Sequence, residues 1–126
     1  MPSRNIADCT PFLQEVWAYG SSEFKRLHPS LPQPFLTCTY RSNQEQEKLY
    51  AKGRTKPGKI VTYSKPGTSK HNIKPARAFD IAFKQGSKLF WTSDLFAKFY
   101  AIVRAKYPRV GWGGNFSFKD FPHFEE

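Results

Sequence analysis

The segment Ala78–Phe83 constrains the fold of this chain most, because large and small residues alternate along it without a break. In an extended strand, Phe79, Ile81 and Phe83 project from one face, and the intervening residues project from the other. The alternation therefore predicts a strand whose large side chains enter a core. Asp80 then stands between two alanines on the opposite face, where there is room beside its carboxylate for solvent or for a bound group.

The elements predicted on either side of this strand are both helices and strands. Apolar spacing and capping residues predict three helices, over 12–19 with Gly20 as its stop, 44–52 with Ser42 or Asn43 as its cap, and 93–106 with Ser93 as its cap. Branched and aromatic residues predict four further strands, over 35–40, 60–63, 110–114 and 116–124, the last two joined by a Gly-Asn turn. Two long loops, 54–59 and 64–75, lie between the second helix and the 78–83 strand. This mixed order of helices and strands along the chain predicts an α+β fold.

Length and composition bound the organisation of the chain. Its 126 residues fit one domain, 1–126, and the 17% aromatic content excludes intrinsic disorder. No apolar run approaches the roughly 20 residues that a bilayer span requires. The first residues lack the apolar stretch of a secretory signal peptide, so we expect the product to begin in the cytoplasm.

The charge balance restricts the surroundings in which the chain works. There are 20 basic and 10 acidic residues, a net charge of +10, which indicates a polyanionic partner such as nucleic acid, an anionic membrane or a cell wall. Charge alone does not choose among these. Cys9 and Cys38 match no metal or disulfide pattern, and we interpret them as ordinary thiols, with a bridge left open.

Histidine is scarce, with only His28, His71 and His123 in the chain. A zinc site built on histidine would therefore need a carboxylate ligand or a position filled by water. His71 lies in the long loop that leads into the strand carrying Asp80. Each histidine taken alone has the ordinary interpretation of a surface or core residue.

Four motifs together resemble those of a known family. Ser69–His71, Ala78–Asp80, Trp112–Gly114 and Asp120–Glu125, with the upstream Thr39–Ser42, resemble the signature of the zinc D-alanyl-D-alanine metallopeptidases. Within that group the chain is most similar to phage endolysins that act as L-alanyl-D-glutamate peptidases on peptidoglycan. The resemblance implies a hedgehog-type fold, a central antiparallel sheet with flanking helices.

The resemblance also implies a zinc ion and its ligands. In the family, the histidine, aspartate and histidine of three motifs bind Zn²⁺, which here implies His71, Asp80 and His123. The acidic residue three before the last ligand is the family's general base, which implies Asp120; the alternative is a turn aspartate. Residues three apart in a regular strand face opposite ways, so Asp120 and His123 converge only if Pro122 or a bulge bends the chain.

The resemblance implies roles for four more residues, and each of them also has an ordinary structural interpretation. Arg41 resembles an arginine that stabilises negative charge near the substrate, and it also fits a surface ion pair. Ser69 resembles a serine that binds substrate, or it caps a loop. Gln46 and Trp112 are candidates to line the cleft, although a glutamine on a helix surface and a packed tryptophan are the alternatives.

The resemblance implies a zinc peptidase that hydrolyses the L-alanyl-D-glutamate bond of peptidoglycan stem peptides. A D-alanyl-D-alanine carboxypeptidase of the same fold is the alternative, and a basic module without catalysis, binding nucleic acid or cell wall, is the alternative from another class. We expect a monomer that does not act on nucleic acid, is encoded by a phage and reaches the wall after release from the cytoplasm.

Overall fold

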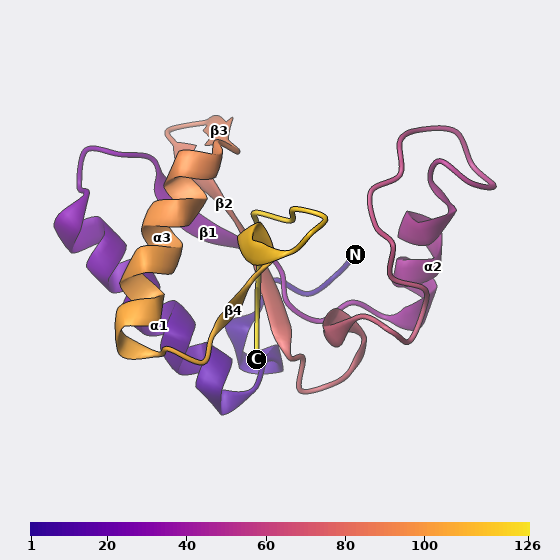
Figure 1. Ribbon diagram of the computed structural model, residues 1–126, viewed down its shortest axis with the longest axis horizontal. Coiled ribbons are helices and arrows are strands. Elements are labelled where there is room, and N and C mark those ends of the chain that lie inside the picture. Colours follow the sequence, from indigo (N-terminus) through magenta and orange to yellow (C-terminus); the bar gives the residue numbers. More distant parts are fainter.

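A five-stranded sheet forms the centre of the molecule in the computed structural model, which describes residues 1–126 (Figure 1). The strands are β1 (Gln33–Cys38), β2 (Ala78–Gln85), β3 (Lys88–Phe90), β4 (Gly111–Trp112) and β5 (His123–Glu125). The helices are α1 (Pro11–Leu27), α2 (Asn43–Ala51) and α3 (Ser93–Lys106), with 3-10 turns η1 (Ile6–Asp8), η2 (Lys70–Asn72) and η3 (Gly113–Asn115). No helix combines the length and apolar character needed to cross a membrane.

Strand β2 organises the sheet, because every pairing except that of β4 with β5 involves it. It pairs antiparallel with β1 along one edge, and with β5 and then β3 along the other. The predicted alternation is confirmed, since Phe79, Ile81 and Phe83 have no exposed surface. These side chains pack against α1 and α3, which lie side by side on one face of the sheet (Figure 1).

Helix α1 is longer than the sequence predicts. Thr10 caps its first turn, with Pro11 at the first helical position, and the helix continues through Gly20 to Leu27. The prediction that Gly20 ends the helix is therefore wrong. A Cβ built on Gly20 would lie 2.6 Å from Phe99 Cζ and from Val103 Cγ1, so the glycine lets α1 approach α3 closely.

The other two helices match their predicted ranges closely. Ser42 caps α2 with a complete capping box to Glu45, as its position predicts. Helix α3 has the predicted bounds, although Thr92 rather than Ser93 occupies the cap position. Helix α2 buries only one residue, Gln46, and lies apart from the α1–α3 pair in Figure 1.

Two predicted strands are wrong. Residues 60–63 form no strand, because no other segment pairs with them, and Val61 and Tyr63 are more than half exposed. Of the predicted strand 116–124, only β5 at its end is extended and paired. The Gly113 carbonyl accepts the Asp120 amide at 2.9 Å, which makes 116–122 a loop rather than an edge of the sheet.

Strand β3 was absent from the sequence prediction, although a local signal for it exists. It forms a hairpin with β2, and Gly86 in the turn has a φ of +61°, a conformation that glycine adopts readily.

The close approach at Gly20 generates a testable expectation. Gly20→Ala gains about 1 kcal/mol of helix propensity but forces a methyl group into Phe99 and Val103, and such overpacking costs about 1–3 kcal/mol. We expect the net effect to be a loss of stability, measured by urea denaturation. Ser22→Ala, at an exposed position of the same helix, is the control and should be neutral or slightly stabilising. A stabilised Gly20→Ala protein would contradict the packing described here.

Candidate metal centre

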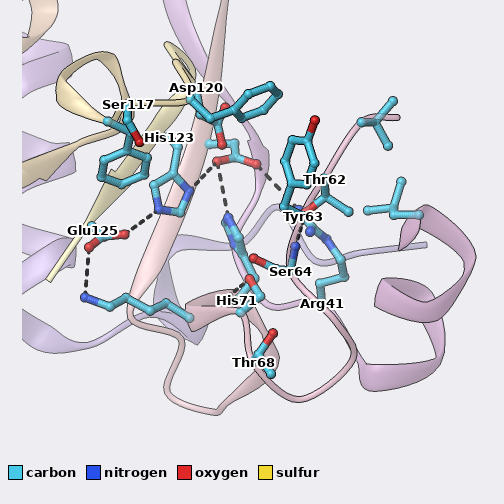
Figure 2. A pocket seen from close by; sticks show the side chains of 17 residues that line it. Arg41, Thr62, Tyr63, Ser64, Thr68, His71, Ser117, Asp120, His123 and Glu125 are labelled. Carbon is cyan, nitrogen blue, oxygen red and sulfur yellow. Dashed lines mark hydrogen bonds and ion pairs between the residues drawn. The ribbon is translucent and has the colours of Figure 1, made fainter. Parts of the chain in front are cut away.

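Three side chains from distant parts of the sequence meet around one carboxylate oxygen. Asp80 on β2 and His123 on β5 are direct cross-strand neighbours, and His71 comes from η2. The Oδ1 atom of Asp80 lies 3.2 Å from His71 Nε2 and 3.3 Å from His123 Nδ1 (Figure 2). The structure thus brings together the three residues that the motifs single out as ligands.

Hydrogen bonds on the far side of each ring orient the two imidazoles. His71 Nδ1 lies 2.7 Å from the Thr39 carbonyl oxygen, which accepts its proton. His123 Nε2 lies 2.8 Å from Glu125 Oε1, which accepts in the same way. Since one nitrogen of each ring is engaged as a donor, the other nitrogen faces Asp80, where it donates to the carboxylate when protonated and is free to bind a metal ion when it is not.

The charges in this cluster depend on one another. Burial alone would raise the pKa of Asp80, but the two imidazoles hold that pKa well below its ordinary value. Burial opposes protonation of the histidines, yet the Asp80 carboxylate raises the pKa of His71 to about 10, and Asp80 and Glu125 raise the pKa of His123 to about 9. The site is therefore built to hold positive charge against a fixed carboxylate.

This donor set suits zinc. Two imidazole nitrogens and one carboxylate oxygen are a common protein contribution to a catalytic zinc site, with the fourth position left for water or substrate. Cys38, His71 and Asp80 form a grouping whose potential ligand atoms all lie within 4.8 Å of one another, and it shares two residues with this set. Its thiol lies 3.7 Å from His71 Nδ1, the nitrogen that already donates to Thr39. Cys38 and His123 are therefore alternative third ligands beside His71 and Asp80.

Asp120 reaches the site because the chain bends before β5. The His123 amide donates to the Asp120 carbonyl at 3.1 Å, so the two residues lie on a turn and not three apart in a strand. Gly113 is required there, since a Cβ on it would overlap the main chain of Asp120. Figure 2 shows Asp120 and His123 on the same side of the cavity. Burial, and next the Asp80 carboxylate, raise the pKa of Asp120 above its ordinary value.

Arg41 is held rigidly beside the carboxylate. Its Nη2 lies 3.6 Å from Asp80 Oδ2, and its Nη1 donates to Gln46 Oε1 at 2.8 Å. Gln46 is fully buried and also donates to the Ser64 carbonyl at 2.8 Å, so it positions the guanidinium without lining the cavity. The side chain of Arg41 is only 11% exposed and therefore acts as a fixed cation.

Ser69 and Trp112 occupy different surroundings. The Ser69 hydroxyl accepts the His71 amide as the cap of η2, and the residue also lines the cavity. Trp112 does not line the cavity. It is buried, donates its indole N–H to the Phe121 carbonyl at 2.8 Å and stacks on Tyr100.

The ligand cluster opens into a cavity of about 650 Å³, a size typical of small-ligand sites. Val61, Tyr63 and Phe118 line it, and the Tyr63 and Phe118 rings meet edge to face with centroids 4.6 Å apart. Sequence reasoning missed these residues, because nothing local marks the loops that carry them as neighbours.

Glu125 was also given no role from the sequence. A signal for it exists, because residues two apart in a strand share a face, and this spacing places Glu125 beside His123.

Comparison with known proteins relates the chain to characterised hydrolases. No protein-family model matches it. The peptidoglycan L-alanyl-D-glutamate endopeptidase CwlK of Bacillus subtilis strain 168 is 38% identical over 98 residues, which are 71% of this chain and 58% of CwlK. The chain thus spans less than two thirds of this relative's length. The crystal structure of the L-Ala D-Glu endopeptidase ChiX of Serratia marcescens matches with a TM-score of 0.67 at 22% identity, covering 99% of this chain and 87% of ChiX.

The chain is thus similar in sequence to the endopeptidase CwlK and shares the fold of ChiX. The resemblance to L-alanyl-D-glutamate peptidases is confirmed, and so is the small α+β fold with an antiparallel sheet and flanking helices. The Asp80, His71 and His123 cluster lines the cavity and is the candidate site in this fold.

The two overlapping ligand sets predict different effects of substitutions on zinc affinity. We expect His123→Ala to weaken zinc binding by about 100-fold or more, because it removes a direct donor, whereas loss of a partner behind a ligand costs about 10–100-fold. Cys38→Ala should leave the zinc dissociation constant within about threefold of the wild-type value. Competition with a chromophoric chelator measures both. The opposite ranking would assign the site to Cys38, His71 and Asp80.

Proposed function

We propose that this chain hydrolyses the L-alanyl-D-glutamate bond of peptidoglycan stem peptides, with zinc held by His71, Asp80 and His123. The observation that carries the proposal is the meeting of two oriented imidazoles and one carboxylate at the floor of an open cavity. The relationship to CwlK supports the choice of bond, since the matched region includes most of this chain.

Each remaining group has a place in the proposed reaction. Zinc, when bound, supplies a Lewis acid that polarises a carbonyl and makes water more acidic. Asp120 accepts a proton from the attacking water and later donates it to the leaving amine. Its raised pKa suits the first transfer, because a carboxylate with a higher pKa is a stronger base.

Arg41 and Ser69 complete the proposed site. The guanidinium of Arg41 is immobilised by Gln46, so its charge is already in place when negative charge develops on the carbonyl oxygen. The Ser69 hydroxyl lies at the cavity wall, where it provides a hydrogen-bond partner for substrate. Action as a phage endolysin on the cell wall is part of the proposal and is supported by the resemblance of the motifs.

The bond that is cleaved is the direct test of the proposed function. Purified zinc-loaded protein is incubated with muropeptides of defined structure, and the products are identified by mass spectrometry. We expect a new amino terminus at D-glutamate. Release of a single terminal alanine would replace the proposal with a D-alanyl-D-alanine carboxypeptidase, and absence of cleavage together with absence of zinc uptake would reject a metallopeptidase altogether.

The role of Asp120 is tested separately. Asp120→Asn keeps the size of the side chain but removes its ability to take a proton, so we expect kcat to fall by about 10²–10⁴-fold with zinc content unchanged. Asp94→Asn, at an exposed position of α3, is the matched control and should retain full activity. A fully active Asp120→Asn protein would exclude the residue as the general base.

A further inference from the structure

An ion pair beside the metal centre has no part in the hydrolysis described above. Lys70 Nζ lies 2.9 Å from Glu125 Oε2 and donates to the main-chain oxygen of Glu126 at 2.8 Å. Both Lys70 and Glu125 line the cavity, and Figure 2 shows Glu125 beside His123. Neither residue contacts Asp80.

The two oxygens of the Glu125 carboxylate have different partners. Oε1 accepts from His123 Nε2 at 2.8 Å, and Oε2 accepts from Lys70. Because the carboxylate is held from both sides, it fixes the His123 ring in the orientation that presents Nδ1 to Asp80. A carboxylate behind a ligating histidine both selects the ring tautomer and strengthens the histidine as a donor.

Lys70 connects the two segments that supply the histidines. It is the residue before His71 on η2, and its side chain reaches across to β5, where Glu125 is two residues after His123. The side chain of Lys70 is 37% exposed and that of Glu125 is 22% exposed. An ion pair this close to water contributes little to global stability, about 0–1 kcal/mol, so its value lies in local geometry.

We propose that Lys70 and Glu125 are positioning residues for the metal centre, which together hold the His123 ring for zinc and fix the spacing between η2 and β5. This inference rests on the proposed function, since it takes His71, Asp80 and His123 as the zinc ligands. The two residues act through His123 and do not touch the reacting atoms.

The test measures the zinc dissociation constant of the full chain by chelator competition. We expect Glu125→Gln to weaken zinc binding about 10–100-fold, the range found when a partner behind a metal ligand is removed. Lys70→Met should also weaken zinc binding, by a smaller factor. Lys70→Arg should bind zinc as the wild type does, because arginine keeps the charge and reaches the carboxylate. At saturating zinc, each variant should recover most of the wild-type kcat.

A matched control separates positioning from a general loss of charge. Lys74 follows on the same segment and pairs with Asp8 at 3.4 Å, away from every proposed ligand. Lys74→Met should therefore bind zinc as the wild type does. Glu125→Gln binding zinc within twofold of wild type, or Lys74→Met losing as much affinity as Lys70→Met, would overturn the inference alone. Wild-type protein that takes up no zinc would overturn the proposed function and this inference with it.

Discussion

The shared contact of Asp80 with two imidazoles is the interaction on which the site depends. A carboxylate removed from water is costly unless charge and hydrogen bonds compensate it, and here His71, His123 and Arg41 all converge on it. The carboxylate stays at this place because its strand is anchored from behind by phenylalanines that have no exposed surface. The strict alternation of β2 thus assigns one face to the core and the other to chemistry.

The aromatic layer behind the sheet gives the candidate metal centre a stiff support. Phe79 stacks on Phe124, the residue between His123 and Glu125, and Phe99 of α3 packs edge-on against Phe124. Since densely packed cores hold their neighbours to within a fraction of an ångström, the strand pair that carries Asp80 and His123 has little freedom to separate. Preorganisation of the ligands is therefore a property of the core as much as of the site.

The parts of this structure that were predictable from sequence are those with a signal spread over many residues. Strand β2 and helix α3 follow from sustained periodicity, and the Ser42 cap follows from local chemistry. The convergence of the three ligand candidates was predictable only from the order of the motifs. His71 and Asp80 are nine positions apart in the sequence, and their side chains meet in the structure.

The wrong predictions from the sequence involve contacts between distant segments, which no local pattern indicates. Gly20 resembles a helix stop until α3 is known to lie against it, and residues 60–63 resemble a strand only while a partner strand is assumed.

The opposite wall of the cavity has a different character from the sheet. Helix α2 and the loop after it bury one polar side chain, Gln46, whose amide contacts Arg41 and Ser64. Segments with so little buried apolar surface open at a small fraction of the global unfolding free energy. The cavity therefore has one wall supported by the aromatic core and one wall that opens at a lower free-energy cost.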